Sequence, residues 1–171
     1  DLAGAQKDEK VPALLDMTKA FETIPHKHIL EAARKHGYNL WVLRLSLKAY
    51  RAPRTVVVDG GCSSLQVASL GITAGSGFAT EELACLLLDV CDDLLAAHPT
   101  VDLTEYVDDL TLGRAGPEWF VTDILASATD LVIDTLEKRL DLQVSAKKSA
   151  VIASSIKQAR DIAQKIGSGK V

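Results

Sequence analysis

The chain has 171 residues, of which 47% are hydrophobic and 25% charged, so it can form one globular domain with a substantial core. Its net charge of −4 argues against a free-standing nucleic-acid binder, which usually carries a strong basic excess, although a local basic patch would escape this test. No apolar run reaches the ~18 residues of a membrane span, so we expect no membrane partner. The three cysteines lack metal-type spacing, so we expect them to be reduced and buried in an intracellular protein.

The first segments predict a linker and a strand. The chain begins at an aspartate without a methionine, so we expect a piece of a longer polypeptide. Residues 1–10 are polar and predict a disordered or linking segment. Residues 11–15 predict a short buried strand that stops at Asp16. A carboxylate at the end of a buried strand is a common place for a ligand, and the alternative is an ordinary turn or cap aspartate.

Two helices are predicted next. The first covers residues 26–36, between Pro25 and Gly37, and we expect its three histidines on the surface because their spacing does not gather them on one helical face. The second is capped by Asn39 and runs to about Tyr50. A basic cluster lies near its end, formed by Arg44, Lys48, Arg51 and Arg54. This cluster predicts a solvated face, and the alternative is a phosphate contact.

A hairpin and a glycine-rich loop follow. Residues 55–59 and 64–68 predict two strands around Gly60-Gly61. Residues 71–77 contain three glycines, so the backbone of this loop can approach a ligand closely. The loop leads into a helix that we expect to end at Ala97, with Glu81 and Glu82 in its first turn as the helix dipole favours.

Adjacent carboxylates, Asp108 and Asp109, separate two strand-like runs at residues 100–107 and 110–113. Neighbouring residues on a strand point to opposite faces, so a strand interior rarely accommodates two aspartates, whereas a tight turn does. The pattern predicts a β-hairpin with both aspartates at its tip. Two interpretations remain open at this point, a plain turn and a metal-binding tip.

The C-terminal third is predicted to be a long helix, two short strands and a final helix. The long helix covers residues 118–140 after Gly116-Pro117. Short strands are expected at residues 142–145 and 150–153, on either side of Lys147-Lys148-Ser149. The last helix covers residues 155–166 and is amphipathic.

Asp16, Asp108 and Asp109 each lie at the end of a predicted strand. Carboxylates on adjacent strands of one sheet can hold two Mg²⁺ ions roughly 3.5–4 Å apart. Mg²⁺ favours a few carboxylates together with substrate phosphates, an arrangement that serves phosphoryl transfer.

Four motifs occur in order along the chain: Asp16-x-x-Lys19-Ala20-Phe21, Ala74-Gly75-Ser76, Tyr106-Val107-Asp108-Asp109 and Lys147-Lys148-Ser149. Together they resemble the palm of a reverse transcriptase, with the closest likeness to the non-LTR retrotransposon and group II intron type. The resemblance implies an α+β fold in which an antiparallel sheet carries the acidic site and helices pack on one side. It also implies a palm domain at residues 11–153, followed by a C-terminal helix and tail at residues 154–171.

The resemblance gives each matching residue a role. Asp16, Asp108 and Asp109 would bind two Mg²⁺ ions, or Mn²⁺ as a substitute, with help from the backbone carbonyl of Met17. Lys148, with Lys147 as the alternative, would protonate the leaving pyrophosphate. The nucleotide-binding positions would be Phe21, Ala74, Gly75 and Tyr106. Phe21 would lie under the nucleotide sugar and exclude a 2′-hydroxyl, although a core aromatic is equally compatible with its spacing.

The sequence departs from the family pattern in three ways. Ala74 stands where glutamine is usual, which removes side-chain hydrogen bonds near the nucleotide. The usual fingers segment before Asp16 is absent, and the thumb after residue 153 is absent or reduced to one helix. A palm alone should hold primer and template poorly, because phosphate contacts dominate affinity for nucleic acid.

The leading hypothesis is therefore the palm of an RNA-directed DNA polymerase from a retroelement, acting by a two-metal mechanism. Its expected partners are an RNA template, a DNA primer, deoxynucleoside triphosphates and the fingers and thumb of a longer chain or larger assembly. An intracellular location follows, with the nucleus as one candidate compartment. The alternative is a degenerate palm kept as a binding or scaffold module, and a two-metal nuclease or nucleotidyl cyclase on a related fold is a third hypothesis.

Overall fold

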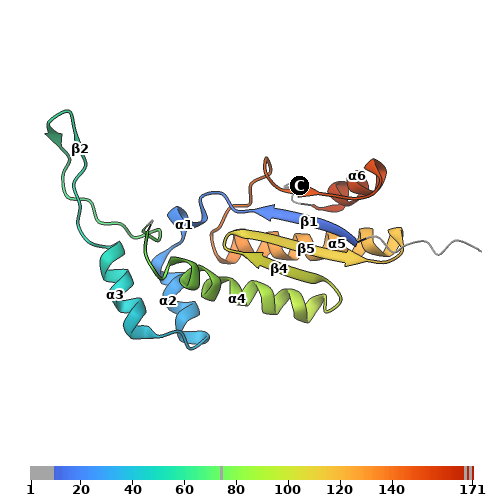
Figure 1. The fold of residues 1–171 in the computed structure, drawn as a ribbon, viewed down its shortest axis with the longest axis horizontal. Helices are drawn as coiled ribbons and strands as arrows, with labels where there is room; N and C mark the ends of the chain where they lie inside the picture. The colour runs from blue at the N-terminus through green and yellow to red at the C-terminus, as the bar shows by residue number, and fades with distance from the viewer. Residues whose placement is uncertain (1–9, 74, 168, 170) are drawn as a thin grey trace, which may run out of the picture.

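A four-stranded antiparallel sheet forms the centre of the computed structural model, which describes residues 10–73, 75–167, 169 and 171 (Figure 1). Its strands lie in the order β4 (Asp102–Tyr106), β5 (Asp109–Ala115), β1 (Lys10–Asp16) and β6 (Ala150–Val151). Helices pack against the sheet, and α5 crosses behind the strands in this view. The predicted α+β class with an antiparallel sheet is therefore confirmed. The predicted linker lies outside the described residues, apart from Lys10, which opens β1.

Side-chain alternation gives the sheet one core face and one open face. In β1, Val11, Ala13 and Leu15 are buried, and they lie opposite the buried Leu110 and Leu112 of β5 or beside them. Because successive side chains on a strand point to opposite faces, the residues between these positions point away from the core. Asp16 is one of them, so the pattern that buries the strand also puts its terminal carboxylate on the open face.

The predicted helices lie within a few residues of their predicted bounds. They are α2 (His26–Lys35), α3 (Leu40–Tyr50), α4 (Ala79–Ala97), α5 (Glu118–Asp134) and α6 (Ile156–Lys165). A short helix that the sequence did not predict, α1 (Ala20–Thr23), follows β1. The predicted cap on α3 is confirmed, since Asn39 Oδ1 accepts hydrogen bonds from the backbone of Trp41 and Val42. The long helix changes to a π-helix, η1 (Thr135–Arg139), over its last turns. In the described part of the chain, no helix combines the length and apolarity needed to cross a membrane.

Several local predictions need correction. The hairpin of β2 (Val57–Val58) and β3 (Gly61–Cys62) is shorter than predicted and projects away from the body of the molecule (Figure 1). The strand expected at residues 142–145 is reduced to an isolated bridge between Val144 and Met17. Cys62 is exposed rather than buried, and all three cysteines are free. A short apolar run predicts pairing, but only neighbouring segments decide how much of it pairs.

The histidines of α2 are not surface residues. His26 is only 7% exposed, and its Nε2 lies 2.8 Å from the carbonyl oxygen of Gly71. The side chains of His28 and His36 are 13% and 14% exposed. Spacing along one helix shows which residues share a face, whereas contacts with the loop at Gly71 and with other helices come from the tertiary fold.

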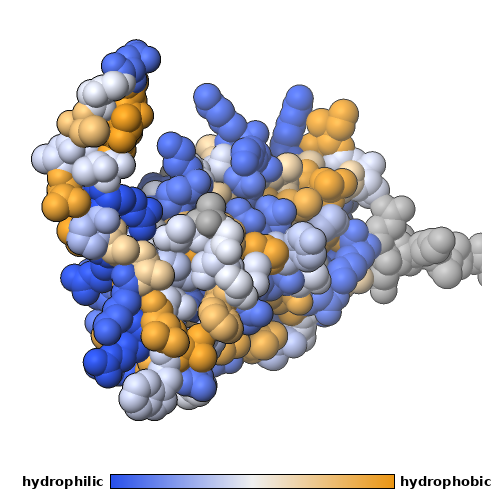
Figure 2. Space-filling view, turned by 60° about the vertical axis from the view of Figure 1, so that its left-hand side comes forward, coloured by the Kyte–Doolittle hydropathy of each residue, from blue (hydrophilic) through white to orange (hydrophobic). Residues whose placement is uncertain are grey.

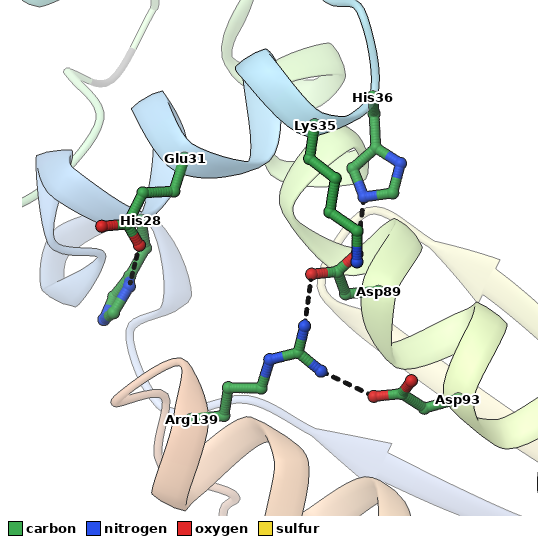
Figure 3. Close-up of polar contacts among 7 residues, drawn as sticks. All are labelled: His28, Glu31, Lys35, His36, Asp89, Asp93 and Arg139. Atoms are coloured by element: carbon green, nitrogen blue, oxygen red, sulfur yellow. Dashed lines mark hydrogen bonds and ion pairs between the residues drawn. The ribbon is translucent and has the colours of Figure 1, made fainter.

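Asp89 on α4 joins three segments that are distant in sequence (Figure 3). Its Oδ1 lies 2.6 Å from Lys35 Nζ and 2.6 Å from His36 Nε2 at the end of α2. Its Oδ2 accepts a hydrogen bond from Arg139 at 2.6 Å, and Arg139 also donates to Asp93. Burial alone would raise the pKa of Asp89, but the hydrogen bonds with Lys35 and His36 and the charge of Arg139 outweigh it and hold this pKa below its usual value.

Replacing Asp89→Asn should destabilise the protein by about 2 kcal/mol at pH 7, because the cations around it lose their shared counter-charge. The pKa of Asp89 is lowered by folding, so its contribution is present above the unfolded-state pKa of ~3.9 and is lost as the pH falls through the folded-state pKa. Urea unfolding at several pH values should show the difference between the two proteins shrinking below about pH 4.

The matched control is Asp134→Asn, which removes an exposed helical ion pair with Lys138. That change should cost no more than about 0.5 kcal/mol. Equal destabilisation by the two substitutions would contradict a special role for Asp89.

Candidate functional site

The predicted acidic hairpin forms, with one correction at its tip. Tyr106 pairs with Asp109, so Val107 and Asp108 are the two turn residues and Asp109 is the first residue of β5. Two-residue turns are favoured because their twist matches that of the flanking strands. Val107 has a φ of 60°, which is unusual for a β-branched residue, and its half-buried side chain packs against the core. Core packing therefore stabilises a strained turn next to the two carboxylates.

Asp16 and Asp109 are directly opposite each other in the antiparallel pair of β1 and β5. Side chains at opposite positions lie on the same face of a sheet, so the register brings these two carboxylates together on the open face. Asp108 is next to them in the turn, and Tyr106 at the end of β4 is 76% exposed. The Asp16 side chain is 19% exposed, and its Oδ2 is a buried oxygen without a hydrogen-bond partner.

A turn at residues 145–149 wraps around Asp16 and contacts it three times. Ser145 N–H donates to the Asp16 carbonyl at 2.8 Å, and Asp16 N–H donates to Ser149 Oγ at 3.2 Å. Lys148 Nζ lies 3.2 Å from Asp16 Oδ1, although the lysine side chain is 69% exposed. The predicted lysine therefore reaches the predicted carboxylate. The motif around Lys148 gave no sign that the two serines, Ser145 and Ser149, hold the backbone of Asp16.

The predicted acids do not form a complete metal site by themselves. In the described ranges, no group of three or more His, Cys, Asp or Glu side chains could hold a metal ion, so Asp16, Asp108 and Asp109 are not gathered into a three-carboxylate cluster. Mg²⁺ usually needs only one or two carboxylates and completes its octahedron with water and phosphates. Asp16 and Asp109 supply the carboxylates, and the partnerless Oδ2 of Asp16 is available as a ligand. The bridge between Met17 and Val144 uses the carbonyl of Asp16 and the amide of Thr18, so it does not involve the Met17 carbonyl.

The glycine-rich loop docks on the segment that follows Asp16. Ile72 N–H donates to the carbonyl of Phe21 at 2.6 Å. Gly71 has a φ of 84°, and a Cβ atom there would meet the carbonyl oxygen of Glu22 at 2.8 Å, so this position requires glycine. Phe21 is half-buried against the core. Gly75 also has a positive φ, of 84°, and Ala74 lies outside the described residues.

A buried polar relay connects this loop to α3 and α4. Tyr50 Oη lies 2.8 Å from Ser76 Oγ and 2.7 Å from Glu82 Oε2. A tyrosine has one hydroxyl hydrogen, and a carboxylate is the stronger acceptor, so Tyr50 donates to Glu82 and accepts from Ser76. Burial and the neighbouring Glu82 raise the pKa of Tyr50 to about 12, which keeps the hydroxyl protonated. The sequence indicated Tyr50 only as the end of a helix and Glu82 only as an acidic residue in the first turn of another, and nothing in their spacing linked them.

Comparisons with known proteins find a likeness in fold but none in sequence family. No protein-family model matches the chain, and no curated protein matches it. Among solved structures it is similar to apo telomerase from Candida tropicalis truncated from the C-terminal domain, with a TM-score of 0.65 and 14% sequence identity. The match covers 90% of this chain and 34% of that one, so the present chain spans about a third of its neighbour. At this identity the likeness shows the fold alone.

Lys148 forms an ion pair with Oδ1 of Asp16, a carboxylate that a metal ion would bind. Replacing Lys148→Gln should therefore raise the affinity of the chain for Mn²⁺ in low salt by roughly two- to fivefold, the value of one exposed ion pair. Paramagnetic broadening of amide signals near Asp16 would measure this affinity. Lys147→Gln is the matched control, because that neighbour forms no ion pair in the described structure. Equal effects from the two lysines would show that only net charge matters.

The raised pKa of Tyr50 predicts how the stability of the fold changes at alkaline pH. Folding raises the pKa of Tyr50 above 10, so its contribution to stability is complete below pH 10 and is lost as the pH rises through about 12. In Tyr50→Phe this part of the alkaline destabilisation should disappear, and amide exchange in residues 75–78 should become faster because Ser76 loses its partner. Stability curves that fall identically above pH 10 in the two proteins would contradict the relay.

Proposed function

We propose that the chain is the palm domain of an RNA-directed DNA polymerase from a retroelement of the non-LTR or group II intron type. Its template would be RNA, its primer DNA and its substrates deoxynucleoside triphosphates. The observation that carries the proposal is the register of β1 against β5, which sets Asp16 opposite Asp109 beside the turn at Asp108. The four sequence motifs support the retroelement type, and the telomerase likeness supports the fold.

The reaction would join the primer 3′-hydroxyl to the α-phosphorus of the nucleotide and release pyrophosphate. When bound, a pair of Mg²⁺ ions supplies charge neutralisation for this phosphoryl transfer. Asp16, Asp108 and Asp109 would hold those ions, and Mn²⁺ could replace them. The ammonium of Lys148, already within 3.2 Å of Asp16, would give its proton to the leaving pyrophosphate.

The remaining residues would position the nucleotide. Phe21 would pack under the sugar and exclude a 2′-hydroxyl, while the loop of Ala74 and Gly75 would follow the base and the template. The contact of this loop with α1 supports such an arrangement, because α1 directly follows the strand that carries the carboxylate. Tyr106, exposed at the end of β4, would contact the nucleotide on the open side of the sheet.

The test is Asp109→Asn, with Asp16→Asn in parallel, in the complete parent polymerase. Extension of a DNA primer on RNA should fall by at least about a hundredfold, the scale at which lost charge stabilisation acts. Asp102→Asn is the matched control, since Asp102 lies in the same hairpin and pairs with Lys10 at an exposed position. Unchanged extension in the Asp109 variant would refute the proposal.

Two observations favour a second candidate, a palm that has lost catalysis and acts as a binding or scaffold module. Lys148 forms an ion pair with Asp16, and alanine replaces the usual glutamine at residue 74. This candidate predicts no selective Mn²⁺ broadening near Asp16 and Asp109 at millimolar metal, with or without a deoxynucleoside triphosphate. Selective broadening that nucleotide strengthens and Asp109→Asn abolishes would exclude it.

A further inference from the structure

A groove of about 560 Å³ runs along the face of α3 that adjoins α2. Its floor is aliphatic, and its rim is basic. The floor consists of Leu30, Leu40, Leu43 and Leu47, and the rim of Arg34, Arg44, Lys48 and Arg51. The residues from α3 recur at helical spacing, so leucines and cations form parallel rows on a single face of the helix.

The rim cations have no acidic partners in the described structure. None of the four forms an ion pair, whereas Lys35, next to Arg34 on α2, is paired with Asp89. Arg44 stacks on the exposed Trp41, with its guanidinium carbon 5.9 Å from the ring centroid. The chain as a whole has a net charge of −4, so four uncompensated cations around one groove are a concentrated local field.

The groove continues beyond α3. A second hollow of about 620 Å³ shares Leu30, Leu47 and Arg51 with the first and reaches Leu70 near the base of the projecting hairpin. Figure 2 shows this side of the molecule, with hydrophobic and hydrophilic residues side by side below the hairpin. Because the two hollows share these three lining residues, they adjoin each other along α3, and their combined lining is large enough for a peptide segment.

We propose that this basic-rimmed groove binds an amphipathic helix of a partner protein, with leucine-like side chains on the floor and Asp or Glu side chains at the rim. A helix-in-groove contact uses apolar anchors at i, i+3, i+4 and i+7, and the leucine row offers a matching surface. Acidic flanks on the partner would complement the four cations and guide its approach. A nucleic-acid strand fits less well, because its phosphates gain nothing from a floor of leucines.

The inference does not depend on the polymerase proposal, and it can be tested with the 171-residue chain. The probe is a fluorescein-labelled helical peptide of ~15 residues, with leucines at the anchor positions and glutamates beside them. A second peptide replaces each glutamate by lysine, and a labelled single-stranded RNA of equal net charge to the acidic peptide is the third probe. Anisotropy titrations should show saturable binding of the acidic peptide, strongest at low salt, and at least about tenfold weaker binding of the other two.

Two pairs of variants test the groove itself. Arg44→Glu combined with Lys48→Glu should weaken binding of the acidic peptide by at least about tenfold. The control, Lys157→Glu combined with Arg160→Glu on α6, makes the same change in net charge and should have no effect. Leu40→Ala should weaken binding several-fold, whereas Leu45→Ala, also exposed on α3 but outside the groove, should not. Circular dichroism melts would confirm that each variant folds.

Three outcomes would overturn the proposal. The first is absence of saturable binding by the acidic peptide, or equal binding of the lysine peptide. The second is RNA binding that exceeds peptide binding and is lost in the charge-reversed groove variant, which would assign the surface to nucleic acid. The third is concentration-dependent self-association that the same variant abolishes, which would make a second copy of the chain the occupant.

Discussion

The register between β1 and β5 is the constraint on which the rest of the site depends. It pairs Leu15 with Leu110 in the core and Asp16 with Asp109 on the open face. Because side chains alternate along a strand, a slip of one residue would expose the leucines and bury the carboxylates. The free energy of leucine burial therefore fixes the position of the two acids, at roughly 2 kcal/mol for each buried leucine. The acidic site needs no separate stabilisation as long as the core pattern holds.

Around this pair the structure concentrates contacts on Asp16. Ser145 and Ser149 bind its backbone, and Lys148 neutralises one carboxylate oxygen while the other remains buried without a partner. A buried oxygen without a hydrogen bond lowers the stability of the fold, and a bound cation would offset that loss of free energy. In the proposed polymerase a metal ion would bind this carboxylate, whereas in this structure Lys148 is its cationic partner.

Buried polar contacts also connect the glycine-rich loop and the helices behind it. Ser76, Tyr50 and Glu82 form a chain of hydrogen bonds beneath the glycine-rich loop, while Asp89 joins α2, α4 and η1. The groove between α2 and α3, proposed as the binding surface for a partner, takes no part in these networks, and α3 lies away from the sheet that carries the acids (Figure 1).

The sequence by itself determined the strand before Asp16, the acidic hairpin, the Asn39 cap and most helix bounds. These features rest on local periodicity, turn chemistry and capping, which act over a few residues. It also indicated the motifs that resemble a reverse transcriptase. Only the tertiary structure decided that Asp109 opens a strand, that His26 is buried against Gly71, that Lys148 reaches Asp16 and that Glu82 meets Tyr50. The last three of these contacts join residues between 32 and 132 positions apart, and a pattern that spans only a few residues carries no information about such contacts.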